Sequence, residues 1–311
     1  MIIDDLINKW VTIPPINDEY KRIDSEHLLD IYLGNDKDSL KELMIVSKLE
    51  PAIVKSGKAI NIEKNKRKDG LWATRMRLLQ QEEESVFINL CFDLIESSRK
   101  GTTLTESLNI FFLRFLKWQR LMEKGLNILS EEIIRGLIGE IIYMRDYLSK
   151  FMNWDEVISA WLGIESADKD FIYLDTWAEI KTIGPSKNFI TISSIEQLSS
   201  NSDGRLVVFE IDKTSSNDIN GFSFSNLIAK TKEVLQLNPN ALNEFESKLF
   251  EIGYYNHPEY EDKFYILNQC RQYRVDNSFP KITPKDLPYG VLNAKYDISL
   301  TAIKDFEISE V

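Results

Sequence analysis

The sequence predicts an α/β fold, α+β over the whole chain, in which a mixed β-sheet is flanked by helices. Three observations lead to this prediction. Between residues 130 and 237 the pattern runs helix, hairpin, strand, short helix, strand and helix, an order that builds a sheet covered by helices. The first 100 residues hold several short strand patterns. A hydrophobic content of 43% with 11% aromatic residues is typical of a folded globular protein.

The predicted core begins with a helix from Ser130 to Met144. Its apolar residues recur at helical spacing on one face, and Ser130 is suited to cap the N-terminus. Gly136 and Gly139 each weaken such a helix by roughly 1 kcal/mol relative to Ala. We therefore expect another element to pack closely against it. Glu140 lies at the edge of the apolar face, where it can point toward a neighbouring sheet.

The segment from Asp168 to Thr182 predicts a β-hairpin that carries acids and a lysine. Asp170 stands at the start of the first strand, and Glu179-x-Lys181 lies near the end of the second. Because side chains alternate along a strand, Glu179 and Lys181 share one face. Two carboxylates and an ammonium together suit a hard cation such as Mg²⁺ and an activated water. The alternative is an ordinary amphipathic hairpin with solvated charges, since this spacing also arises by chance.

Further predicted elements surround the hairpin. A short helix at 153–162 precedes it, and a strand at 189–192 with a short helix at 193–198 follows it. Residues 205–211 are nearly all apolar, which is typical of a strand buried on both faces. Residues 224–237 predict the next helix.

This arrangement resembles the core of the PD-(D/E)XK nuclease superfamily, which includes many restriction endonucleases. The resemblance covers about residues 130–237 and implies a restriction-endonuclease-like fold. It implies that Asp170 and Glu179 bind the metal and that Lys181 is the lysine of the motif. Further roles implied by the resemblance are metal-site contributions from Glu140 and the Ile180 carbonyl, and a catalytic role for Gln197.

Over the whole chain, short motifs resemble a smaller bacterial group called PD-(D/E)XK motif proteins. The motifs are Gly139-Glu140, Trp161-x-Gly163, Asp170-Phe171, Glu179-x-Lys181-Thr182, Phe279-Pro280 and Leu287-Pro288. Members of this group occur beside DNA methyltransferases in restriction-like, phage-defence gene clusters. One departure from the superfamily pattern is Lys169, which stands where that pattern has proline.

The resemblance implies a metal-dependent endonuclease that hydrolyses phosphodiester bonds of double-stranded DNA in a restriction-modification or phage-defence system. Mg²⁺ is the expected cofactor, with Mn²⁺ as a substitute. Other defence-system proteins and a second copy of the chain are the protein partners to consider. The alternative is a catalytically inactive DNA-binding or scaffold subunit with the same fold, and a hydrolase of nucleotides or RNA is a weaker rival. An intact Glu179-x-Lys181 favours catalysis, because a degenerate site usually loses one of these groups.

The formal net charge of −11 argues against a protein whose whole surface attracts DNA. Positive charge is instead concentrated in a turn at Lys68-Asp69-Gly70 and in a helix from Leu104 to Glu123. The candidate DNA-binding residues are Lys64, Lys66, Arg67 and Lys68 around the turn, and Arg114, Lys117 and Arg120 on one face of the helix. For both sets the alternative is an ordinary solvated surface.

Three regions are expected along the chain. Residues 1–100 are expected to be β-rich, with strands near 28–33, 43–46, 71–79 and 86–94, and are a candidate DNA-binding region. Residues 101–240 hold a helical lead-in and the nuclease core. Residues 241–311 form an α+β extension with a helix at 241–252 and strands at 263–273 and 291–300.

The sequence also favours a cytoplasmic location without a membrane partner. No run of 18 or more apolar residues occurs, and the N-terminus lacks the pattern of a signal peptide. Cys91 and Cys270 lie in apolar, strand-like settings and are expected to be free thiols, which fits a reducing compartment.

Overall fold

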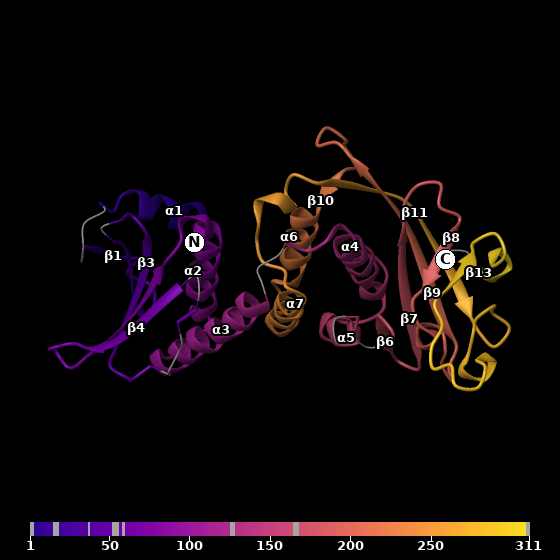
Figure 1. The fold of residues 1–311 in the computed structure, drawn as a ribbon, viewed down its shortest axis with the longest axis horizontal. Helices are drawn as coiled ribbons and strands as arrows, with labels where there is room; N and C mark the ends of the chain where they lie inside the picture. Colours follow the sequence, from indigo (N-terminus) through magenta and orange to yellow (C-terminus); the bar gives the residue numbers. More distant parts are fainter. Residues whose placement is uncertain are drawn as a thin grey trace. The chain divides into compact units, whose positions relative to one another are not determined.

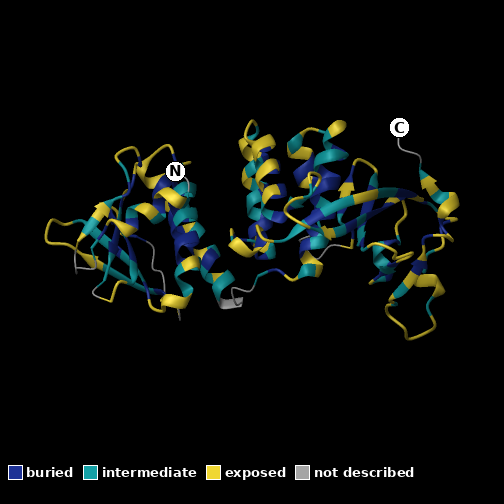
Figure 2. Cartoon of the chain, turned by 90° about the horizontal axis from the view of Figure 1, so that it is seen from above, coloured by how far each residue is buried: buried dark blue, intermediate teal, exposed yellow. Residues whose placement is uncertain are grey.

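A computed structural model describes residues 3–14, 19–36, 38–51, 56–57, 60–124, 128–163 and 168–308. The chain forms two compact units, residues 1–126 and 127–311, which are described separately (Figure 1). In each unit the buried residues lie between helices and a sheet (Figure 2). Within the described ranges, no helix combines the length and the hydropathy that crossing a membrane requires.

The first unit contains an antiparallel sheet with the strand order β1-β2-β3-β5-β4. Its strands are β1 (Tyr20–Arg22), β2 (Asp30–Asn35), β3 (Lys41–Ser47), β4 (Ile60–Lys66) and β5 (Trp72–Leu78). Helices α1 (Ile3–Val11), α2 (Glu84–Ser98) and α3 (Leu104–Lys124) complete the unit. The predicted turn joins β4 to β5 as a hairpin, and Gly70 has the positive φ of +85° that such a turn favours.

The strand expected at residues 86–94 is wrong, because this segment lies inside helix α2. Its apolar run suggested a buried strand, but Phe87, Leu90, Leu94 and Ile95 are buried at helical spacing. A short, continuous apolar run does not distinguish a strand from a helix that is buried over a wide face. Cys91 is therefore a buried helical thiol and not a strand residue, and both cysteines are free.

The second unit is built on a mixed sheet with the order β10-β11-β9-β7-β6, with β13 added to β11. Strands β7 and β9 are parallel, and the other neighbours are antiparallel. The strands are β6 (Phe171–Tyr173), β7 (Thr176–Ile183), β9 (Gly204–Thr214), β10 (Phe222–Ser223), β11 (Phe264–Val275) and β13 (Glu307–Ile308). The predicted hairpin is therefore the β6–β7 pair. The mixed α+β fold expected from the sequence is confirmed.

Different elements cover the two faces of this sheet (Figure 1). One face packs against helices α4 (Glu131–Asp146), α5 (Trp154–Ala160), α6 (Phe224–Leu235) and α7 (Pro239–Ile252). The other face packs against the small sheet of β8 (Phe189–Ile192) and β12 (Tyr296–Ser299) and the 3₁₀ turn η3 (Ile195–Gln197). Ala178 and Ile180 of β7 join the helical side, and Trp177 and Ile183 join the opposite side.

Three predicted elements of this unit differ in extent or partner. The strand at 189–192 is β8, but it pairs with β12 and not with the main sheet. The short helix expected at 193–198 is only the 3₁₀ turn η3, since serines on both sides are weak helix formers. The strand expected at 291–300 is confined to 296–299.

Two glycines on α4 provide a test of how closely this helix packs on β7. A Cβ at Gly139 would lie 2.7 Å from Thr182 and 3.1 Å from Ile180, whereas at Gly136 the nearest atom is 3.9 Å away. We expect Gly139→Ala to lower the free energy of unfolding by about 1–3 kcal/mol through overpacking. We expect Gly136→Ala to raise it by up to about 1 kcal/mol, because only helix propensity changes. Chemical denaturation of both variants checks this, and equal effects would contradict it.

Candidate active site

The candidate site lies beside β7, directly before the first residue of the edge strand β6. Pairing between the two strands stops at Phe171 and Ala178, so β6 does not continue along β7 beyond this point. The Ile180 amide donates a hydrogen bond of 2.7 Å to the Asp170 carboxylate. Asp170 thus replaces a strand partner at this edge, which fixes its carboxylate beside the middle of β7.

Glu179 and Lys181 lie on the same side of β7, as alternation along the strand predicts. Lys181 Nζ is 2.8 Å from Glu179 Oε1 and donates to Gln197 Oε1 at 3.1 Å. Gln197 belongs to η3, and its side-chain oxygen also accepts from the Ser193 amide at 2.8 Å. Glu179 is only 1% exposed, whereas the side chain of Lys181 is 16% exposed. Within this ion pair, Lys181 is therefore the group that solvent or a ligand can contact.

Glu140 reaches the same region from helix α4. The Trp161 indole N–H donates to Glu140 Oε2 at 2.6 Å. A Cβ placed on Gly163 would lie 2.9 Å from Asp170 Oδ1 and 3.0 Å from Glu140 Oε2. Carboxylates from two different elements therefore face the same glycine. The side chain of Glu140 points toward the hairpin, as the sequence predicted.

Burial raises the pKa values of all three carboxyl groups, and the charge of Asp170 adds to the rise at both glutamates. Burial, and then the charge of Asp170, raises the pKa of Glu179 to about 8. Burial, and then the charge of Asp170, also raises the pKa of Glu140 well above its usual range. Burial raises the pKa of Asp170 as well, while the Ile180 hydrogen bond and the Lys181 charge oppose that rise. The cluster therefore brings three acids together in a buried site. A bound cation would stabilise their charged forms.

These residues supply the hard oxygen donors that Mg²⁺ prefers. Asp170 and Glu179 each offer a carboxylate, and the Ile180 carbonyl and Glu140 are further oxygen donors nearby. Among the described residues, no group of three or more His, Cys, Asp or Glu side chains already stands at metal-binding geometry. The donor set that fits is therefore a pair of carboxylates with main-chain or water oxygens, and the space at Gly163 leaves room between acids.

Gly163 provides a direct test of that space. Gly163→Ala would place a methyl group within about 3 Å of both Asp170 and Glu140. We expect Mg²⁺ affinity to fall by roughly tenfold, the effect typical of disturbing groups around a metal site. Isothermal titration of Mg²⁺ and Mn²⁺ checks this, with Gly184→Ala as a control, because its Cβ would meet only Arg135 at 3.7 Å. Unchanged metal affinity would mean that cations do not enter this space.

Sequence reasoning assigned no role in the site to two residues that contribute to it. Lys169 is only 5% exposed, and its ammonium donates to the carbonyls of Glu196 and Ser199 and lies 4.4 Å from the centre of the Trp177 ring. It therefore ties the start of β6 to the segment that carries Gln197. Trp161 was noticed only as part of a motif, and its hydrogen bond to Glu140 requires a long-range contact that no local pattern reveals.

Some cations of the β4–β5 hairpin in the first unit have acidic or aromatic partners. Lys64 and Lys66 lie over the Trp72 ring at 5.3 and 5.6 Å, and Lys64 also pairs with Glu50 at 2.9 Å. Arg67 pairs with Asp69 at 3.0 Å, and Lys68 is exposed. The hairpin tip therefore presents cations to solvent, although part of their charge is balanced locally.

On the basic face of α3, Arg114 makes structural contacts with the neighbouring helix α2. Arg114 binds Asp93 of α2 through two hydrogen bonds of 2.6 and 2.9 Å, and Trp118 donates to the same carboxylate at 2.7 Å. Lys117 is half-buried, and Arg120 is exposed. The guanidinium of Arg114 thus joins two helices, and of these three residues Arg120 is the most accessible to a phosphate.

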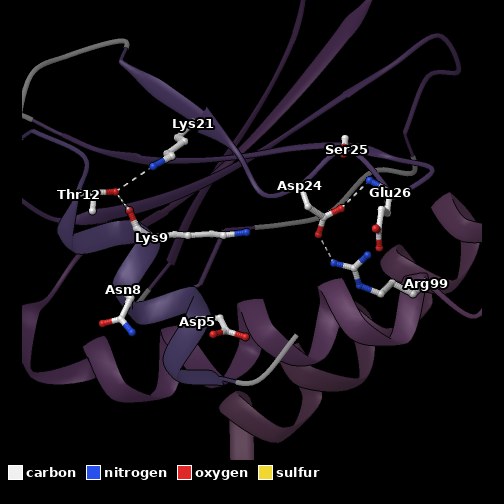
Figure 3. A pocket seen from close by; sticks show the side chains of 9 residues that line it. All are labelled: Asp5, Asn8, Lys9, Thr12, Lys21, Asp24, Ser25, Glu26 and Arg99. Carbon is white, nitrogen blue, oxygen red and sulfur yellow. Dashed lines mark hydrogen bonds and ion pairs between the residues drawn. The ribbon is translucent and has the colours of Figure 1, made fainter.

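A cavity of about 670 Å³ in the first unit is separate from the candidate site (Figure 3). Its lining is polar, and several of its side chains are held by one another or by the backbone. Arg99 pairs with Asp24, and Lys21 donates to Thr12 at 3.2 Å. The side-chain hydrogen bond and charge of Arg99 help to lower the pKa of Asp24 to about 2, against the opposing effect of its burial. These interactions stabilise the unit and define no catalytic group.

The chain belongs to the family DUF4420, described as "Putative PD-(D/E)XK family member", whose model matches residues 7–301. The match covers both units and includes every candidate site residue. No curated protein and no solved structure is significantly similar to the chain. The membership confirms the superfamily that the sequence motifs indicated and supports a nuclease-like fold.

Proposed function

We propose that this chain is a Mg²⁺-dependent DNA endonuclease that acts in a cytoplasmic restriction-modification or phage-defence system. The observation that carries the proposal is the convergence of Asp170, Glu179 and Lys181 at one point of the sheet edge. An acid held at the Ile180 amide, beside a buried Glu–Lys pair, offers two carboxylates to a cation and an ammonium to the phosphate, which suits metal-dependent phosphodiester hydrolysis. The defence role rests on the resemblance of the motifs to proteins of such gene clusters.

Asp170 and Glu179 would hold the cation, with the Ile180 carbonyl as a further ligand and Glu140 as a direct or water-mediated one. When bound, Mg²⁺ would polarise the scissile phosphate and lower the pKa of a water molecule. The Ile180 amide fixes the orientation of the Asp170 carboxylate, and the Trp161 indole does the same for Glu140. Such fixed ligands reduce the reorganisation needed when the cation binds.

Lys181 would orient the attacking water and offset the negative charge that develops on the phosphate. Its ammonium is already held between Glu179 and Gln197. Gln197 accepts from both Lys181 and the Ser193 amide, so it fixes where the ammonium lies. Its role would be to position Lys181 and not to transfer a proton.

The distribution of charge suggests where DNA is bound. Residues 127–311 contain 18 Lys and Arg against 29 Asp and Glu, and residues 1–126 contain 20 of each. All of the net charge of −11 therefore lies in the unit with the candidate site. Because phosphate contacts dominate affinity for DNA, we expect locally basic segments to supply the binding. Lys66, Arg67, Lys68 and Arg120 are the exposed members of the candidate set, and Arg67 is paired with Asp69.

The test is a plasmid cleavage assay with Mg²⁺ or Mn²⁺, on methylated and unmethylated DNA, with and without the products of neighbouring genes. The expected result is metal-dependent cleavage that EDTA stops. DNA binding without cleavage under every condition would overturn the proposal in favour of a scaffold subunit. Cleavage of RNA or free nucleotides alone would point to the other hydrolase class. Light scattering on the same samples determines whether the chain forms a homodimer.

A further inference from the structure

One lysine of helix α7 is buried among apolar side chains. Lys248 is only 7% exposed. It shares one face of the helix with three buried residues, Ala241, Phe245 and Leu249. Burying an ammonium costs free energy unless close polar partners replace the water that it loses. A lysine on the buried face of a helix therefore requires a partner that explains its place.

That partner is the main chain at the end of helix α5. Lys248 Nζ donates to the Trp161 carbonyl, and Glu244 Oε1 lies 3.7 Å from the same ammonium. Helix α5 ends at Ala160, and Trp161 leaves it with a φ of −80° and a ψ of 103°. Carbonyls at the end of a helix lack intrahelical donors, and a cation is favourable there. Lys248 thus fixes the point at which the chain leaves α5.

Trp161 connects this point to the candidate site. Its side chain is fully buried, and its ring centre lies 5.8 Å from that of Phe245, one turn before Lys248 on α7. Its indole N–H donates to Glu140 Oε2 at 2.6 Å. Because α7 contacts both the carbonyl and the ring of Trp161, this helix sets the direction in which the indole N–H points.

The acids of the candidate site differ in what holds them. Strand β7 itself supplies the hydrogen-bond or charge partners of Asp170 and Glu179. Glu140 comes from helix α4, and the Trp161 indole binds its carboxylate. The position of this third acid therefore depends on Trp161, and through Trp161 on Lys248.

We propose that Lys248 is a positioning residue of the candidate metal site and acts through Trp161 on Glu140. By holding the Trp161 carbonyl, it keeps the indole N–H on the Glu140 carboxylate and fixes that carboxylate where a cation would use it. Groups that orient a ligand in this way strengthen metal binding. Lys248 needs no contact with the cation or with DNA in this role. The inference rests on the proposed function, because it assigns Glu140 to the metal site.

The first measurement is hydrogen exchange of the indole N–H groups, followed by NMR in the full-length, metal-free protein. We expect Lys248→Met to speed exchange at Trp161 about tenfold or more, because local opening of this segment becomes easier. Trp177 is the internal reference, since its indole donates to the Ser202 carbonyl at 3.0 Å on the opposite face of the same sheet. Exchange at Trp177 should not change. Trp161→Phe and Trp177→Phe assign the two signals.

The second measurement is the affinity for Mg²⁺ and Mn²⁺ by isothermal titration. We expect Lys248→Met to weaken binding about tenfold, as when a group that orients a ligand is lost. In a Glu140→Gln background the same change should have less than about a twofold effect, because both act through one contact. Lys248→Arg keeps a donor and should restore most of the affinity. The control is Lys232→Met, which removes a lysine that pairs with Glu246 of α7 at 3.2 Å and should bind as wild type does.

The outcomes separate this inference from the proposed function. Equal acceleration at Trp161 and Trp177, or none at either, would overturn the inference, since a general loss of stability affects both. Additive losses of metal affinity in the Glu140→Gln background would also overturn it. Unchanged affinity in Trp161→Phe would do so even if Lys248→Met does not fold, because the indole is the link. If the wild type binds no cation, the metal-dependent function fails, whereas acceleration confined to Trp161 still supports the positioning contact.

Discussion

Asp170→Asn is expected to reduce DNA cleavage below detection while the fold and the affinity for DNA persist. The amide oxygen of Asn can still accept the hydrogen bond from the Ile180 amide, which spans 2.7 Å in the wild type. What disappears is the negative charge that the cation needs as a ligand. Cleavage of plasmid at saturating Mg²⁺ measures the first effect, and anisotropy with labelled duplex measures the second.

The variant should fold at least as well as the wild type. In the metal-free protein, Asp170 raises the pKa values of Glu179 and Glu140 through charge repulsion in a buried site. Removing its charge relieves that repulsion, so we expect an unchanged or higher melting temperature. Asp175→Asn is the matched control, because Asp175 is an exposed acid in the turn of the same hairpin. Full cleavage by Asp170→Asn would show that these acids do not hold the catalytic metal.

Local patterns predicted much of the candidate site. Alternation along a strand placed Glu179 and Lys181 on one face without any knowledge of the tertiary fold. The two glycines of the first core helix suggested close packing, and the structure shows this at Gly139 and not at Gly136. Ser130 caps that helix through its hydroxyl, as expected. Each of these features depends on residues only a few positions apart.

Features that depend on distant residues could not be predicted in this way. Helix α2 looked like a strand because its buried face is wide and its apolar run is interrupted only by Asn89 and Asp93. Lys169 was noted only as standing where the superfamily pattern has proline, yet carbonyls about 30 residues downstream bind its ammonium. Arg114 belonged to an apparently solvent-facing basic stripe, but Asp93 of the preceding helix holds it. A charge pattern in the sequence shows which helix face carries the cations, but it does not show which acids of other elements pair with them.

Lys181→Ala separates a catalyst from a scaffold with the same fold. The ammonium lies 2.8 Å from Glu179 and is needed mainly when the phosphate gains negative charge. We expect cleavage to fall about a hundredfold or more, as when one preorganised electrostatic group is removed. Binding should change only by the few-fold loss of one phosphate contact. The rate is measured at saturating Mg²⁺, because loss of Lys181 also favours protonation of the buried Glu179.

Lys187→Ala is the matched control for this charge, since Lys187 is an exposed lysine that follows the same strand and lies over the Phe189 ring. Lys181→Met keeps most of the side-chain volume and should be as inactive as Lys181→Ala if the ammonium itself is required. Activity near wild type in Lys181→Met would instead assign the residue a packing role. If Lys181→Ala and Asp170→Asn both kept full activity, the Glu–Lys pair would be a structural ion pair. Any cleavage would then have to arise at another site.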